Sequence, residues 1–325
     1  MSVPPASDAA AHAFSPSDAA VSGFRFIGRR PGVIAIWTGV FLLYEVVVTL
    51  LLIALPGNTV GAMRTFRELN QTDPEAAIGM LPAVGFVLLV YSVGFLALYA
   101  VMYTAAYRAF LTPSDKRPGY LHLGVDEFYM ACVIVLAVAL SSGYLFLVIF
   151  VGGLLWAIGS GLPDLLKFLY DVALGFGLLG ALLYPFVRFS LAMPMTFMDK
   201  HVRLIESWKA TRGEFWSMLG AYILAAVLIF LVYLVTWSVV AVVALAAILS
   251  TGGSFTSLET LFQADTSSIA AYLTPTTLIA ALLNAIASAV FVAVVTGPVA
   301  EAYRAMVGGV REPSPAAPRR LPAKA

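Results

Sequence analysis

Long apolar runs separated by short polar connectors make up most of this chain between residues 33 and 302. A helix that crosses the hydrocarbon core of a bilayer needs about 20 mostly apolar residues. Six runs reach that length, and several exceed it, so the longer helices must tilt or extend beyond the bilayer. The pattern predicts an all-α, polytopic membrane helix bundle with six transmembrane helices, over Val33–Leu55, Met80–Tyr107, Phe128–Ile158, Phe168–Val187, Trp216–Ser250 and Thr276–Ala302.

Basic residues are distributed unevenly between the two sides of these helices. Of 19 Lys and Arg residues, 16 fall in the two terminal segments and in the second and fourth connectors, whereas only Arg64, Arg67 and Lys167 fall in the other connectors. Short loops rich in Lys and Arg stay on the cytoplasmic side during insertion. We therefore expect a multi-pass membrane protein with both termini in the cytoplasm.

The polar composition of both ends of the chain predicts a division into two tails and one transmembrane domain. Residues 1–23, rich in Ala, Ser, Pro and Asp, are expected to form a disordered cytoplasmic tail, residues 24–308 a six-helix transmembrane domain, and residues 309–325 a second disordered cytoplasmic tail. Interfacial helices are expected in the second and fourth connectors. The clearest lies over Asp199–Phe215, where apolar and basic residues alternate at helical spacing.

Composition and motifs exclude several classes of function. The chain is 61% hydrophobic and 11% charged, and its single cysteine, Cys132, excludes an intrachain disulfide and a cysteine-based zinc site. Gly175–Gly180 matches the dinucleotide-binding pattern, but it lies inside an apolar helix, where small residues serve helix packing. Metal-ligand spacing, nucleophile motifs and dense basic patches are absent from the sequence. We expect no enzymatic activity, no cofactor and no nucleic-acid partner.

Glu45 is the one charged residue in the middle of a predicted transmembrane helix. A carboxylate at that depth costs at least about 2.5 kcal/mol, so it must be protonated, paired, or directed at the bundle interior or a wet cavity. Two hypotheses remain open. Glu45 is either a functional residue, acting as an ion or proton relay or a substrate contact, or a protonated acid hydrogen-bonded to a neighbouring helix. Asn284, in the sixth helix, is expected to join helices by hydrogen bonding.

Arginines also mark the ends of the even-numbered helices. Arg108, Arg188 and Arg304 are expected to reach the lipid headgroups and anchor the helices. The alternative is a basic ring around a cytoplasmic vestibule, formed by these three arginines and Glu301, which can pair with Arg304 at i, i+3. A further expectation concerns the acidic pair at 126–127, which fits the first turn of the third helix because acids stabilise helix N-termini.

Two connectors resemble those of a known group of proteins. Arg188–Trp216, centred on Ser207–Trp216, and Arg117–Glu127 resemble the connectors of uncharacterised six-helix bacterial inner-membrane proteins. These include proteins similar to the membrane domain attached to some glycerophosphodiester phosphodiesterases. The likeness covers roughly residues 24–308 and implies a family without an assigned activity, so it assigns no catalytic residue.

Two functions are therefore expected. The first is a non-enzymatic scaffold or envelope-homeostasis component whose partners are the lipid bilayer and either another membrane protein or a second copy of the chain. The alternative is a small-molecule or lipid transporter that uses Glu45, an idea favoured by the repeated Ala-Tyr-Arg-Ala at 106–109 and 302–305, which hints at parallel repeats. Transport requires a path to Glu45, whereas a scaffold requires a packed interior.

Overall fold

The computed structural model describes residues 14–55, 59–114, 117–251, 266 and 268–307. The described residues form helices and connectors, with no strand among them. The helices are α1 (Pro16–Ala20), α2 (Ser22–Arg29), α3 (Pro31–Ala54), α4 (Thr59–Thr72), α5 (Pro74–Gly79), α6 (Leu81–Leu111), the 3₁₀ turn η1 (Pro118–Tyr120), α7 (Val125–Gly159), α8 (Asp164–Phe189), α9 (Ala192–Asp199), α10 (Leu204–Ala210), α11 (Phe215–Thr251), α13 (Ile269–Tyr272) and α14 (Pro275–Met306).

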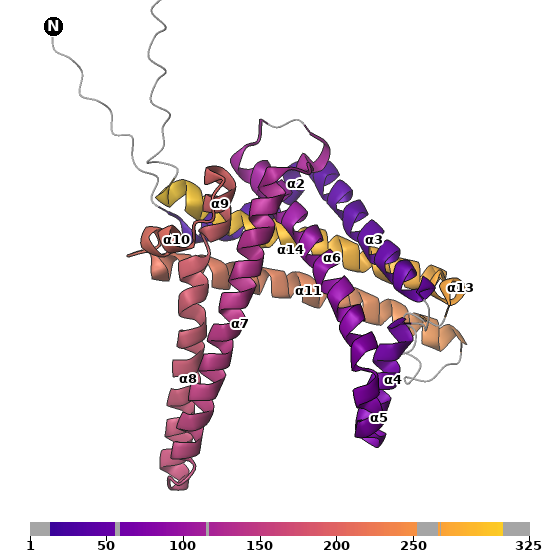
Figure 1. Ribbon diagram of the computed structural model, residues 1–325. Helices are drawn as coiled ribbons and strands as arrows, with labels where there is room; N and C mark the ends of the chain where they lie inside the picture. The colour runs from indigo at the N-terminus through magenta and orange to yellow at the C-terminus, as the bar shows by residue number, and fades with distance from the viewer. Residues whose placement is uncertain (1–13, 56–58, 115–116, 252–265, 267, 308–325) are drawn as a thin grey trace, which may run out of the picture.

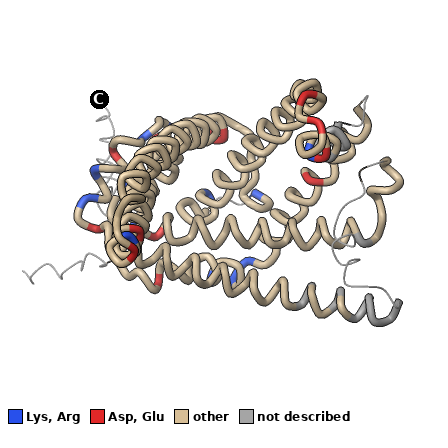
Figure 2. The backbone as a smooth tube through the Cα atoms, turned by 90° about the horizontal axis from the view of Figure 1, so that it is seen from below, with Lys and Arg blue, Asp and Glu red and all other residues tan. Residues whose placement is uncertain are grey.

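Six of these helices, α3, α6, α7, α8, α11 and α14, are long and apolar enough to span a membrane. They coincide with the six predicted segments, so the predicted fold class is confirmed and the chain is an integral, multi-pass membrane protein. Charged residues lie mainly at helix ends and in connectors, and the helix bodies are almost free of them (Figure 2). This distribution follows from the cost of placing a charge in hydrocarbon.

The long helices are not aligned as in a simple bundle. α7 and α8 form a hairpin that projects from the rest of the molecule, whereas α11 and α14 cross at a steep angle to it (Figure 1). The view from below agrees, because the hairpin is foreshortened there while α11 and α14 are seen along their length (Figure 2). Lipid tails are as apolar as the helix surfaces, so hydrophobicity alone does not draw such helices together.

The main core lies where α3, α6 and α14 meet near α2. Trp37 on α3 is fully buried there, and its indole N–H donates a hydrogen bond to the carbonyl oxygen of Gly119 at 2.8 Å. Gly119 has φ +60, which glycine adopts without steric cost. The bond fixes the second connector against α3. Among the described residues of that connector, which leave out 115–116, the helical part is the short η1, and no longer interfacial helix of the expected kind is formed there.

The N-terminal helices pack against the C-terminal helix, so both ends of the described chain lie together at one end of the molecule. This end, which also carries η1, α9 and α10, is called the basic end below (Figure 1). α2 crosses α14 closely: a Cβ built on Gly23 would lie 2.5 Å from Val294 Cα, and one built on Gly297 would lie 2.6 Å from Gly23 N. Side chains larger than hydrogen do not fit at this crossing.

The N-terminal tail was expected to reach residue 23, but α1 and the start of α2 lie before that residue. Ser15 caps α1, with Pro16 at its first position, and Ala19 and Ala20 are buried. The prediction was wrong for residues 14–23 because small residues, which read as a polar tail, here allow close packing against α14 and α11. Residues 1–13 and the second predicted tail, 309–325, lie outside the described residues.

The fourth connector also differs from its prediction. Instead of one helix over Asp199–Phe215, it contains α9 and the shorter α10, separated by a turn at Lys200. Lys200 has φ 57, a left-handed conformation that ends α9. In α10, a hydrogen bond from Arg203 lowers the pKa of Glu206 below its ordinary value. α9 contacts α7 and α10 contacts α8, so the connector packs against the ends of two long helices.

We expect Gly23→Ala to destabilise the protein by about 1–3 kcal/mol, because the added methyl group would overlap the backbone of α14. Gly28→Ala is the matched control, since it lies on the same helix and a Cβ there would have no neighbour within 4 Å. Unfolding of both variants in mixed micelles by increasing dodecyl sulfate measures the difference. Equal unfolding midpoints would contradict the close α2–α14 crossing.

Candidate functional site

A large cavity lies between α3, α6, α7, α9 and α14. Its volume is about 1160 Å³, and its lining is mostly apolar with a few polar groups. Glu45 is the only charged residue among the nineteen described residues that line it. Glu45 is the fifteenth residue of α3, which places it about 21 Å from the start of the helix at 1.5 Å per residue. The cavity thus reaches the middle of a membrane-spanning helix.

Glu45 is held by a residue from a distant part of the chain. The side-chain amide of Asn284, on α14, donates a hydrogen bond to Glu45 Oε2 at 3.0 Å. Among the described residues, no Lys, Arg or His lies within ion-pair distance of Glu45 or lines the cavity. Glu45 therefore has an interhelical partner, as one of the two sequence hypotheses requires, and also faces a cavity, as the other requires.

Aromatic rings form one wall of this cavity. Tyr91, Phe95, Tyr99 and Tyr103 follow one another on α6 at a spacing of four residues, which places them along one face of the helix. Phe95 and Tyr99 have ring centroids 4.1 Å apart, and Tyr99 and Tyr103 have theirs 5.6 Å apart. The sequence analysis missed this wall. Its regular spacing was the available signal, but it was hidden in a segment that is apolar on every side.

The end of the cavity away from the basic end is close to α13. Tyr272 on α13 is buried and shares a side-chain hydrogen bond with Thr49, which lines the cavity. Burial raises the pKa of Tyr272 above its ordinary value; the hydrogen bond with Thr49 opposes this rise, and the nearby carboxylate of Glu45 adds to it. Tyr272 therefore stays a neutral hydroxyl and adds another polar group beside Glu45.

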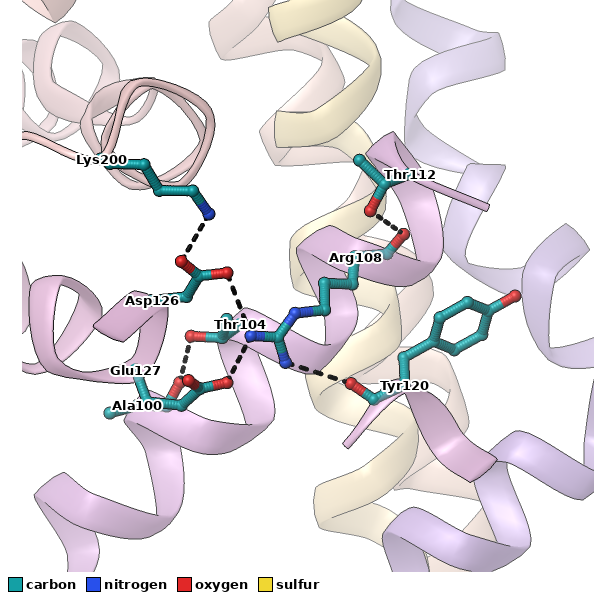
Figure 3. Close-up of polar contacts among 8 residues, drawn as sticks. All are labelled: Ala100, Thr104, Arg108, Thr112, Tyr120, Asp126, Glu127 and Lys200. Atoms are coloured by element: carbon teal, nitrogen blue, oxygen red, sulfur yellow. Dashed lines mark hydrogen bonds and ion pairs between the residues drawn. The ribbon is translucent and has the colours of Figure 1, made fainter. Parts of the chain in front are cut away.

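A buried cluster of charges lies at the basic end, where α6 meets α7 (Figure 3). Arg108, on α6, is only 4% exposed, and its Nη2 lies 2.6 Å from Glu127 Oε1 and 3.2 Å from Asp126 Oδ2. Its Nη1 donates a hydrogen bond to the carbonyl oxygen of Tyr120 at 3.3 Å. Lys200, beyond the end of α9, pairs with the other oxygen of Asp126. The cluster thus joins α6, α7, the second connector and the fourth connector.

This cluster changes the interpretation of two sequence features. Asp126 and Glu127 do lie in the first turn of α7, as their position predicted. They are also the counterions of Arg108, which the sequence did not reveal because 18 residues separate Arg108 from Asp126. Arg108 was expected to extend to the lipid headgroups. Its side chain is instead buried among these carboxylates.

Arg188, at the end of α8, is buried in a different environment. Its guanidinium lies 5.2 Å from the ring centroid of Tyr184 and 5.4 Å from that of Trp208, and it donates hydrogen bonds to Tyr184 and Thr211. The carbonyl oxygen of Arg188 accepts a hydrogen bond from Ser207. Cation–π contacts and hydrogen bonds take the place of an ion pair here. They attach α10 to the end of α8.

A second, smaller cavity of about 540 Å³ lies at the basic end between α1, α2, α6 and α14. Of the four residues predicted for a vestibule, Glu301 and Arg304 line it, together with Arg25, Arg29 and Arg30. Glu301 and Arg304 form the i, i+3 ion pair that their spacing predicted, at 3.1 Å. Arg108 and Arg188 are not among the residues lining this cavity. The structure therefore divides the four candidate residues among three sites.

Within the described part of the chain, no group of three or more His, Cys, Asp or Glu side chains lies close enough together to hold a metal ion. Comparisons with protein-family models, with curated proteins and with solved structures found no match. Functional inference therefore rests on the geometry of the cavity and of the charged clusters.

We expect Arg108→Gln to destabilise the protein by about 3–5 kcal/mol, because it leaves the buried Glu127 without a counterion, whereas Asp126 keeps its ion pair with Lys200. The double variant Arg108→Gln with Glu127→Gln should recover part of that loss, since it removes the uncompensated charge. Unfolding free energies from dodecyl sulfate titration in mixed micelles test both expectations.

The matched control for Arg108 is Glu301→Gln, which breaks an exposed ion pair and should cost at most about 1 kcal/mol. If Arg108→Gln and Glu301→Gln destabilised the protein equally, the buried cluster would not join α6 to α7 energetically.

Proposed function

We propose that this protein is a bacterial inner-membrane protein that binds an amphipathic small molecule or lipid in its central cavity and moves it within or across the bilayer. The observation that carries the proposal is the cavity of about 1160 Å³ that reaches Glu45. Of the two functions expected from the sequence, transport required a path to Glu45 and a scaffold required a packed interior. The cavity supports transport.

The size and lining of the cavity support an amphipathic ligand. The cavity is partly open rather than enclosed, and its volume of about 1160 Å³ exceeds the roughly 300–1000 Å³ of pockets for small ligands. It is therefore large enough for an alkyl or acyl chain. Its apolar surface suits such a chain, while Glu45, Asn284 and Ser288 provide polar contacts at one place.

A scaffold function, the first hypothesis from the sequence, has one observation in its favour. The α7–α8 hairpin projects from the rest of the molecule (Figure 1). Most of its apolar side chains are exposed. Such a hairpin offers a surface to the helices of another membrane protein. Lipid also covers such surfaces, so the hairpin favours this function less specifically than the cavity favours ligand binding.

We expect Ser288→Phe to remove amphiphile binding, because the ring would occupy the cavity beside Glu45. Ser141→Phe is the matched control, since Ser141 is exposed on α7 and lines none of the cavities described here. Mass spectrometry of lipid that stays bound to the purified protein measures the effect. A loss of at least about tenfold, or 1.4 kcal/mol, is expected for Ser288→Phe alone.

Two results would count against the proposal. Wild-type protein without any bound amphiphile would overturn it, and so would equal retention by the two variants. In either case the scaffold function would be the better account of the chain.

We further propose that the basic end faces the cytoplasm, because connectors rich in Lys and Arg remain there during insertion. In a Cys132→Ala background, Ser114→Cys should be protected from an impermeant maleimide in intact cells, whereas Ser254→Cys should be labelled. Ser114 lies in the exposed second connector at the basic end. The reverse labelling pattern would show the opposite orientation.

A further inference from the structure

We propose that the ligand of the central cavity carries a positively charged ammonium group, which binds between Glu45 and the aromatic wall. This inference rests on the proposed function and names the chemical class of its ligand. The class includes alkylamines and amphiphiles with a quaternary ammonium head. Three features of the cavity support it: an uncompensated carboxylate, a high content of aromatic rings, and the absence of any base from the lining.

The first feature is the environment of the carboxylate. Glu45 accepts one hydrogen bond, from Asn284, and no basic side chain among the described residues neutralises it. Glu45 is half-buried and Asn284 is exposed, so the pair is not sealed inside the protein. A carboxylate at hydrocarbon depth without a counterion is costly, and the cost falls when a cation occupies the adjacent space. A positively charged ligand head would supply the counterion that the protein chain itself does not place there.

The second feature is the aromatic wall. Seven of the nineteen lining residues are aromatic, whereas aromatic residues make up 12% of the chain. Phe41, on the same helix as Glu45, has its ring centroid 5.8 Å from that of Tyr99 on α6, so the wall begins one helical turn from the carboxylate. The faces of aromatic rings attract cations, and sites for quaternary ammonium groups combine such faces with an acidic side chain.

The third feature argues against an anionic ligand. Of the bases at the basic end, Arg25, Arg29 and Arg304 line the separate smaller cavity, and Arg108 and Arg188 line neither cavity. A phosphate or carboxylate head in the central cavity would face Glu45 with no base to bind it. A neutral head would gain hydrogen bonds from Asn284 and the hydroxyl groups, but it would leave the carboxylate uncompensated. Charge complementarity therefore favours the ammonium head over both.

Photolabelling in nanodiscs tests the inference. The two probes share one alkyl chain with a diazirine near the head, and they differ only in the head: trimethylammonioethyl in one and its neutral carbon isostere, 3,3-dimethylbutyl, in the other. Mass spectrometry measures labelling of α3 relative to labelling of the lipid-exposed surface around Ser141 in the same sample. This ratio corrects for unequal partitioning of the two probes into the bilayer.

In wild-type protein the cationic probe should label α3 about tenfold more than the neutral probe. Glu45→Gln should abolish that preference while the neutral probe still labels, because glutamine keeps the shape and the acceptor for Asn284 but lacks the charge. Glu45→Asp should retain a preference. Glu45→Ala, which also removes the charge, should abolish the preference too and serves as a second variant if Glu45→Gln does not fold.

Each contrary result has its own meaning. Equal labelling of wild-type α3 by both probes, or an unchanged preference in Glu45→Gln, would overturn the ammonium inference and leave amphiphile binding intact. Failure of both probes to label wild-type α3 above the lipid-exposed surface would overturn the proposed function itself.

Discussion

The ion pairs of Arg108 with Asp126 and Glu127 determine how α6 meets α7. The cluster joins the end of α6 to the beginning of α7 at the basic end, and Lys200 joins the fourth connector to Asp126. Away from this point α6 and α7 diverge (Figure 1). The central cavity is lined by these diverging segments together with α3, α9 and α14. The cavity therefore exists because the helices are fastened at one end and separate toward the other.

The remaining helix contacts reflect the fact that lipid, and not water, surrounds the membrane-spanning helices. Burial of hydrophobic side chains stabilises a protein in water. In a bilayer these side chains are in an apolar environment whether they face another helix or lipid, so their burial does not favour one helix contact over another. Specific contacts must then come from close backbone approach and from polar groups. The Gly23–Gly297 crossing is an example of the first, and the Asn284–Glu45 hydrogen bond is an example of the second. Both involve α14, which is why the last helix organises the packing of the first ones.

Glu45 illustrates how far sequence reasoning reached into the site. Its isolation in an apolar helix identified it as the residue that topology does not explain, and the structure places it at the cavity. The sequence left open whether Glu45 is packed against a neighbouring helix or accessible from a cavity. Either arrangement lowers the free-energy cost of a carboxylate in hydrocarbon, so that cost does not distinguish them. The aromatic wall on α6 was missed for a related reason. In a helix that is apolar on all sides, periodicity does not distinguish a face toward a cavity from a face toward lipid.

The sequence by itself determined the number of membrane-spanning helices and their limits, because hydrocarbon thickness and the cost of charge act on each segment separately. It also predicted local relations such as the Glu301–Arg304 pair, since helix geometry alone sets the i, i+3 distance. Only the tertiary structure decided that Arg108 is buried against α7, that residues 14–23 are folded, and that the helices splay around a cavity. These features depend on contacts between segments far apart in the chain, and in lipid no general hydrophobic force makes such contacts predictable from composition.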